Sequence, residues 1–262
     1  MHKRAALGTA FILSLLPASA LPAADTPRVA YIALIIDDLG NNAVTDNRAA
    51  RLPGPVACAV LPHTSHGVDV ADTAFGLNKE VLLHLPMEAL SDHEPGPGTL
   101  DTSMFEREFA KMLDYDLASV PHVVGINNHM GSRLTADAAF MTELMRDIHQ
   151  RGKLFFIDSR TNPESVAATT AHEVGVPALS RDVFLDNEPS VAAIEQQLKT
   201  LIRLAHKNGT AIGIGHPHPT TLAVLEQWLP LLAEQRIKLI PLNSMLELTH
   251  QEAAPWQASL SH

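Results

Sequence analysis

The stretch "YIALIIDDLGNN" (31–42) carries an apolar run directly into two adjacent acids. Residues 31–36 are apolar at consecutive positions, which is typical of a parallel strand that is covered on both faces. Asp37 and Asp38 then stand at the end of that strand, where two carboxylates cost desolvation and mutual repulsion unless something offsets them. A turn could use one of the two acids, whereas a metal site or a proton-transfer site could use both.

Seven more apolar runs follow along the chain, and amphipathic segments separate them. Alternation of helices with strands of the parallel type predicts an α/β fold, either a barrel or a doubly wound sheet. The seven runs are "VACAVLP" (56–62), "EVLLHLP" (80–86), "VVGINN" (123–128), "LFFIDS" (154–159), "VFLDN" (183–187), "AIGIGH" (211–216) and "IKLIPL" (237–242).

The intervening segments carry helix signals. Helices are predicted over 104–117, 164–175 and 189–209. Asn162 and Pro163 fit the N-cap and first position of the second of these helices. The third repeats apolar side chains at helical spacing.

The first 24 residues have the layout of a secretory signal peptide. A basic start precedes a short apolar centre, and small residues allow cleavage after Ala20 or after Ala24. The apolar centre is too short for a comfortable membrane span. We therefore expect an exported protein, periplasmic or secreted, in which residues 27–250 form a single domain and residues 251–262 a flexible tail.

Composition narrows the class of partner. The net charge is −10 with His neutral, which argues against a nucleic-acid partner because phosphate backbones recruit basic surfaces. Hydrophobic residues make up 46% of the chain, which favours a packed core over disorder. Cys58 is the only cysteine, and its apolar surroundings predict a buried, inert thiol.

Polar and ionisable side chains gather at or just after the carboxyl ends of the predicted strands. Active sites of parallel α/β folds collect at that edge. Random placement would not put so many ionisable residues on one rim. The residues concerned are Asp37, Asp38, His84, Asn127, Asn128, His129, Arg133, Asp158, Arg160, Asp186, His216 and His218.

Part of this set can bind a divalent metal. Asp and His are oxygen and nitrogen ligands suited to Zn²⁺, and a catalytic site needs three protein ligands and one open position. Asp38, His84 and His129 form the leading ligand set. Asp37 could then act as a general base, and His216 as a general acid from across the pocket.

Several of these residues also have a structural interpretation. Asp38 could cap the strand end near Gly40. His84 stands among leucines and could be a hydrogen-bonded core residue. Asp158 and Arg160 could simply pair with each other.

Two further assignments are structural. We interpret Asp186 as the cap of the helix that starts near Pro189. The remaining histidines fall in predicted loops or helices, so we expect them at the surface. They are His63, His66, His93, His122, His149, His172, His206 and His250.

Five segments, in order, resemble the divergent polysaccharide deacetylase family, a branch of the carbohydrate esterase superfamily. The resemblance covers roughly residues 28–248. It implies a distorted (β/α) barrel, usually of seven parallel strands, and metal-dependent removal of acetyl groups from N-acetylated sugars. The segments are "IALIIDDLG" (32–40), "EVLLHLPME" (80–88), "GINNHMGSRLT" (125–135), "FFIDSRT" (155–161) and "AIGIGHPHP" (211–219).

The resemblance also implies residue roles. In the superfamily the first motif pairs a base with a metal ligand, which matches Asp37 and Asp38. The second motif supplies a ligand that matches His84, and the last motif supplies the catalytic histidine that matches His216.

The chain departs from the superfamily pattern at two places. The second motif usually holds another histidine four residues on, where this chain has Glu88, so His129 would supply the missing ligand. The arginine–proline motif has no clear counterpart, and Arg133 or Arg160 is the candidate to replace its arginine.

The sequence therefore predicts an exported hydrolase, dependent on a divalent metal such as Zn²⁺, that removes N-acetyl groups from a glycan or peptidoglycan fragment. Arg133 or Asp158 is expected to orient Asp37 or His216. The alternatives are a non-catalytic glycan-binding or cell-envelope interaction protein on the same fold, and a hydrolase of another amide or ester. Substrate contacts are expected from Asn128, Arg160 and His218.

Overall fold

One parallel sheet forms the centre of the molecule. The computed structural model describes residues 29–104 and 106–249, and within them the sheet has nine strands. The predicted leader (1–24) and tail (251–262) lie outside the described residues. The strands are β1 (Ala30–Leu39), β2 (Ala57–Val60), β3 (Val81–Met87), β4 (Val123–Met130), β5 (Phe155–Asp158), β6 (Ala178–Ser180), β7 (Val183–Phe184), β8 (Thr210–Gly215) and β9 (Ile237–Leu239).

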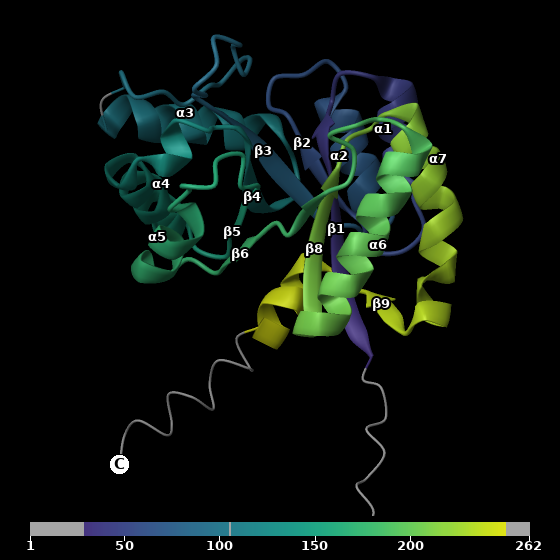
Figure 1. The fold of residues 1–262 in the computed structure, drawn as a ribbon. Coiled ribbons are helices and arrows are strands. Elements are labelled where there is room, and N and C mark those ends of the chain that lie inside the picture. Colours follow the sequence, from purple (N-terminus) through teal and green to yellow (C-terminus); the bar gives the residue numbers. More distant parts are fainter. Residues whose placement is uncertain (1–28, 105, 250–262) are drawn as a thin grey trace, which may run out of the picture.

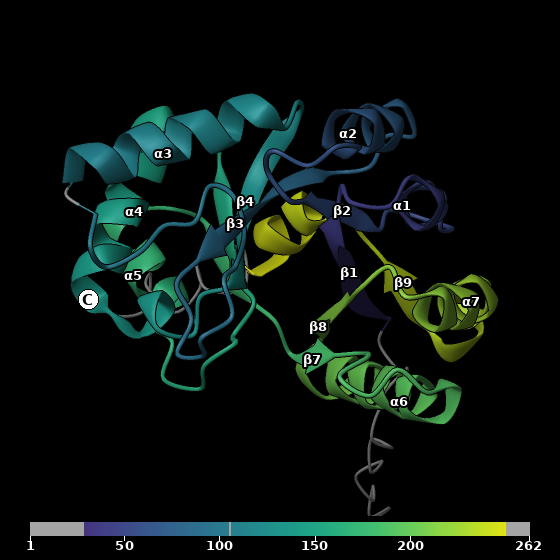
Figure 2. The same ribbon diagram turned by 90° about the horizontal axis from the view of Figure 1, so that it is seen from above.

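The sheet curls into a barrel whose two edge strands, β6 and β7, do not pair with each other. The strand order is β6-β5-β4-β3-β2-β1-β8-β7, with β9 paired to β1, and each of these pairings is parallel. The edge strands β6 and β7 are separated in the chain by Arg181 and Asp182 alone. Backbone N–H groups of these two residues donate to Asp158 O and Ile212 O, which links β5 to β8. The fold is therefore a distorted (β/α) barrel, seen from above in Figure 2, and not a doubly wound sheet.

Helices surround the sheet (Figure 1). Residues 242–249 add a further helical segment at the C-terminal end of the described chain. Among the helices in the described ranges, none combines the length and apolar character that crossing a membrane requires. The α-helices are α1 (Ala43–Ala50), α2 (Gly67–Gly76), α3 (Glu106–Ser119), α4 (Ala138–Arg151), α5 (Ala167–Val174), α6 (Val191–Asn208) and α7 (Pro219–Trp228), and the 3₁₀ helices are Leu134–Ala136 and Leu229–Gln235.

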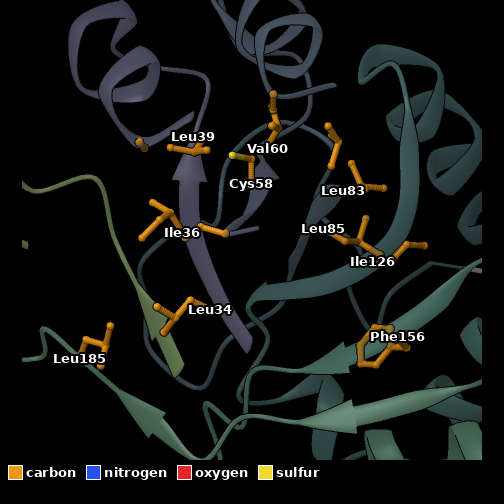
Figure 3. Close-up of a cluster of buried hydrophobic side chains, with 14 of the residues drawn as sticks. Leu34, Ile36, Leu39, Cys58, Val60, Leu83, Leu85, Ile126, Phe156 and Leu185 are labelled. Carbon is orange, nitrogen blue, oxygen red and sulfur yellow. The ribbon is translucent and has the colours of Figure 1, made fainter. Parts of the chain in front are cut away.

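Strand side chains alternate between two buried layers, as the two-residue period of a strand requires. Leu34 and Ile36 of β1 and Leu83 and Leu85 of β3 belong to an outer layer that packs against the helices (Figure 3). The side chains between them enter an inner layer, inside the barrel. The inner layer includes Ala33, Ile35, Leu82, Phe155, Ile157, Ile212 and Ile214, with Ile240, Leu242, Met245 and Leu246 from the C-terminal segment.

The predicted fold class is confirmed, with differences in detail. The strand β6 was not predicted, and only the first two residues of the run 183–187 form β7. The helix predicted over 164–175 begins later, at Ala167. Asn162 does not cap that helix: its side-chain oxygen accepts the backbone N–H of Glu164 in a preceding turn.

Candidate active site

The inner layer turns from apolar to polar at the carboxyl ends of the strands. The leucines that flank His84 in sequence point to the outer layer instead, so the histidine itself faces the barrel interior. Buried polar residues that extend the inner layer by the two-residue alternation are Asp37 after Ile35, His84 after Leu82, Asn127 in β4 and Asp186 after Phe184. His216 follows Ile214 in the same way and is partly buried.

A β-bulge brings the second acid of the opening pair into the same place. Ile36 pairs with Cys58 and Leu39 with Val60, so β1 has one residue more than β2 across this interval. Asp38 also has a φ of 60°, in the left-handed region that is uncommon for residues with a side chain. Simple alternation would send Asp38 to the outer layer; the bulge lets both carboxylates reach one site.

Three side chains from β1, β3 and β4 converge there. Asp38 Oδ1 lies 3.1 Å from His84 Nε2 and 2.9 Å from His129 Nδ1. The two imidazole nitrogens are 3.2 Å apart. Ligand atoms at about 2.0–2.1 Å from a tetrahedral Zn²⁺ are separated from one another by about 3.3 Å. The triangle of Asp38, His84 and His129 has this size, so these residues can hold a metal ion.

The hydrogen bonding of Asp38 also fits a cation. Its Oδ1 is buried and, within the described part of the chain, has no assigned hydrogen-bond partner, although two imidazole nitrogens lie within 3.1 Å of it. Burial opposes its charge, but the imidazoles of His129 and His84 hold the pKa of Asp38 well below its usual range. A carboxylate that stays ionised, with one buried oxygen facing two nitrogens, is a suitable ligand for a divalent ion.

Asp37 lies beside this triangle and is fully enclosed. Its Oδ1 accepts a hydrogen bond from Asn127 Nδ2 at 2.8 Å, and its Oδ2 is 3.7 Å from His84 Nε2. Burial raises the pKa of Asp37, against the lowering effect of His84 and His216. A carboxylate whose pKa is raised by burial takes up a proton more readily than an exposed one.

His216 lies on the other side of Asp38. Its Nε2 is 3.9 Å from Asp38 Oδ2, and its Nδ1 is 2.8 Å from Asp186 Oδ1. Although burial opposes the charged imidazole, Asp186 raises the pKa of His216 to about 9. His216 is therefore protonated at neutral pH and can donate a proton.

The expected role of Asp186 as a helix cap is wrong. The cap of α6 is Ser190, whose hydroxyl accepts the N–H of Ala193. Asp186 instead extends the inner layer, and its Oδ2 accepts the His216 N–H and the Thr221 hydroxyl. The two-residue alternation from Phe184 was the signal that could have identified Asp186.

His218 completes a second group of possible ligands with Asp186 and His216. In this group both carboxylate oxygens already accept hydrogen bonds from N–H or O–H donors. The rings of His216 and His218 are 5.8 Å apart, and His218 is exposed. The arrangement is that of an imidazole oriented by a carboxylate, with His218 at the rim.

Arg133 is not placed to orient Asp37 or His216. Its guanidinium Nε is 2.9 Å from Glu88 Oε1. Glu88 Oε2 in turn accepts the backbone N–H and hydroxyl of Thr102. Glu88, which stands where the superfamily has a ligand histidine, therefore joins two loops of the rim.

Asp158 and Asn128 face away from the metal triangle. Asp158 follows the outer-layer Phe156, and its carboxylate accepts the Arg160 N–H and the Ser165 hydroxyl. The Asn128 amide is buried; it accepts the Ser159 N–H and donates to Met130 O. Both side chains hold the ends of β4 and β5 in place.

Arg160 lies at the exposed rim. The contact expected between Arg160 and Asp158 runs through the Arg160 backbone N–H. Among the described residues no carboxylate forms an ion pair with its guanidinium. Arg160 is thus available to a ligand, as is His218.

Asn127 belongs to the polar run at the end of β4, and the sequence predicted no role for it. It is fully buried and contacts both Asp37 and His84. Its position two residues before His129, on the same face of β4, was the available signal.

Comparison with known proteins identifies a matching family and similar proteins. The profile of the family described as divergent polysaccharide deacetylase matches residues 34–246. The chain is 37% identical over 237 residues to the uncharacterized protein YibQ of Escherichia coli K12, covering 90% of this chain and 74% of that protein.

Solved structures show the same fold. The uncharacterized protein ATU2773 from Agrobacterium tumefaciens C58 superimposes with a TM-score of 0.80 at 25% identity, covering 87% of this chain and 92% of that one. A mutant of BA3943, described as a CE4 family pseudoenzyme with restored activity and originating from Bacillus anthracis, gives a TM-score of 0.52 at 15% identity, covering 84% of this chain and 68% of that one.

Proposed function

The chain belongs to the divergent polysaccharide deacetylase family, and on that premise we propose that it is an exported, metal-dependent hydrolase that removes N-acetyl groups from a glycan. One observation carries the proposal. A triangle of metal-ligand atoms, with an orphaned carboxylate oxygen at one corner, lies between a buried carboxylate and a protonated imidazole.

Asp38, His84 and His129 would hold the metal, for which we propose Zn²⁺ because the ligand set is one oxygen and two nitrogens. A divalent ion bound there supplies an activated water at neutral pH and polarises a carbonyl oxygen. The protein's own contribution is to place proton-transfer groups on both sides of the reacting carbon.

Asp37 and His216 divide the proton transfers. Asp37 accepts the proton of the attacking water, and burial favours this step because it raises the pKa of the Asp37 carboxyl group. His216 gives its Nε2 proton to the departing amine, and Asp186 keeps it charged until then. A carboxylate that takes up a proton and an imidazolium that gives one up are the usual pairing of a general base with a general acid.

The substrate would enter over the exposed rim. Arg160 and His218 are the side chains there that are free to contact a sugar. We propose a peptidoglycan fragment or another N-acetylated glycan as the substrate.

The test combines metal analysis with product analysis. Purified protein should contain stoichiometric zinc and release acetate from N-acetylated chito-oligosaccharides or from peptidoglycan fragments. A His216→Ala variant should keep the zinc and lose the acetate release. Zinc-loaded protein that releases acetate from none of these glycans would contradict the proposal, and a product screen by mass spectrometry would then detect hydrolysis of another amide or ester.

One observation favours a second function, non-catalytic glycan binding. Glu88 takes the place of a ligand histidine, and its carboxylate is committed to Arg133 and Thr102. Glycan binding without turnover, measured by calorimetry on the same oligosaccharides, would support this second function.

A further inference from the structure

Asn127 connects two residues of the candidate active site through one amide. It lies in β4 directly opposite His84 of β3 in the strand register. Its side chain is fully buried. The amide nitrogen is 2.8 Å from Asp37 Oδ1, and the amide oxygen is 3.0 Å from His84 Nδ1.

Charge fixes which way this amide points. An ionised Asp37 only accepts hydrogen bonds, so the Asn127 NH₂ group must face it. The Asn127 oxygen then faces His84 and can only accept, so His84 Nδ1 must carry a hydrogen. A neutral imidazole has one N–H and one lone pair, which leaves the lone pair on Nε2.

From this geometry we infer that Asn127 is a positioning residue that selects the tautomer and ring orientation of His84. The free Nε2 lone pair faces Asp38 Oδ1 at 3.1 Å and His129 Nδ1 at 3.2 Å, where a cation would bind. The inference rests on the metal dependence in the proposed function. It adds a residue outside the ligand set that determines whether His84 can act as a ligand.

Only an amide meets both requirements at this position. A carboxylate could accept the His84 N–H but could not donate to Asp37 while ionised. An apolar side chain of similar size could do neither, and would leave His84 free to carry its proton on Nε2 in place of Nδ1. Partners of this kind typically change metal affinity by about 10–100-fold.

The two halves of the amide can be tested separately. The full chain and its Asn127→Asp and Asn127→Leu variants are stripped of metal, and their Zn²⁺ affinity is measured by competition with a chromophoric chelator. We expect Asn127→Leu to bind Zn²⁺ about 10–100-fold more weakly. Asn127→Asp keeps the acceptor for His84 Nδ1, and should bind within about fivefold of the wild type or more tightly.

Asn128 provides the matched control, because its amide is also buried but serves the β4 and β5 ends. Asn128→Leu should lower the thermal unfolding temperature and leave Zn²⁺ affinity within about threefold. ¹⁵N NMR of the zinc-loaded wild type should show the His84 proton on Nδ1.

The outcomes separate this inference from the proposed function. If Asn127→Leu binds Zn²⁺ as tightly as the wild type, or if Asn127→Asp is weakened as much as Asn127→Leu, the inference is wrong while metal dependence stands. A proton on His84 Nε2 in the loaded protein would overturn it as well. A wild type that binds no Zn²⁺ would overturn both.

Discussion

Two clusters of one aspartate and two histidines lie side by side at the barrel mouth, with His216 Nε2 3.9 Å from Asp38 Oδ2, and their hydrogen bonding differs. In the first cluster, Asp38 Oδ1 has no hydrogen-bond partner among the described residues, although two imidazole nitrogens lie within 3.1 Å. In the second, the two oxygens of Asp186 accept hydrogen bonds from two N–H groups and one hydroxyl. The residue types are the same, yet one oxygen of Asp38 lacks a hydrogen-bond partner among the described residues, whereas both oxygens of Asp186 have one.

The difference shows how one fold can build two kinds of site from the same side chains. An unsatisfied buried carboxylate oxygen is costly unless a cation meets it. A satisfied carboxylate fixes the orientation and charge of the imidazole beside it. The first cluster is therefore the metal candidate, and the second is an oriented proton donor.

The same isosteric change in both clusters gives the largest expected contrast. Asp38→Asn removes a charged ligand, so Zn²⁺ affinity should fall. The fall should exceed the about 10–100-fold that is typical when a residue hydrogen-bonded to a metal ligand is lost. Asp186→Asn should keep stoichiometric zinc, because Asp186 is engaged by N–H and O–H donors. Elemental analysis after dialysis measures both. Equal zinc loss in the two variants would abolish the distinction between the clusters.

Asp186→Asn should instead change the pH profile of acetate release. Asp186 raises the pKa of His216 to about 9, so the wild-type imidazolium, and the activity that needs it, persists below that pH and is lost above it. Without the carboxylate charge of Asp186 the pKa of His216 falls towards about 6.5. The pH above which acetate release is lost should fall with it. At pH 8 kcat should therefore decrease. The decrease should be smaller than the full contribution of a positioned acid, which is about 10²–10⁴-fold. An unchanged alkaline limb would show that another group donates the proton.

Much of this site could be predicted from the sequence, because strand ends can be located and side chains alternate between the two faces of a strand. Short apolar runs placed the acids and imidazoles on one rim, and Asp38, His84 and His129 do converge. The same alternation, applied to β5, would have excluded Asp158, since it follows the outer-layer Phe156. The local pattern was sufficient at this position.

Other features could not be predicted from local pattern. The bulge and the φ of 60° at Asp38 arise from the mismatch between β1 and β2, which is a property of strand pairing. The partnership of Arg133 with Glu88 likewise depends on two loops that meet only in the folded chain. The signal peptide, the tail and the substrate stay predictions.

Another aspartate contacts a single histidine elsewhere in the molecule, and this pair extends the comparison. His63, expected at the surface, is partly buried, and its Nε2 is 2.7 Å from Oδ1 of the fully buried Asp116. Burial raises the pKa of Asp116 to about 8 and lowers that of His63. The pair is therefore neutral at pH 7, with its proton on the carboxyl group.

This pair should make stability depend on pH in one window. From about pH 6.5 to 8 the unfolded residues bind none while folded Asp116 keeps its proton, so the free energy of unfolding should fall by about 2 kcal/mol. Urea unfolding of metal-free protein at pH 6.5 to 9 measures it, with Asp116→Asn as the reference. A wild-type-minus-variant difference that stays constant across this range would refute the neutral pair.

Arg133→Ala should have the smallest effect, and it tests whether either cluster needs a guanidinium. The Arg133–Glu88 ion pair is partly exposed, and such pairs are worth about 0–1 kcal/mol. Asp37 is held by Asn127 and His216 by Asp186, so neither proton-transfer group loses a contact when Arg133 is truncated. We expect kcat within about threefold of the wild type and a small decrease in unfolding free energy. A fall in kcat beyond 10²-fold, roughly the value of a positioned acid or base, would mean that Arg133 reaches the reacting groups during turnover. Asn127 and Asp186 would then not be sufficient to orient the two clusters.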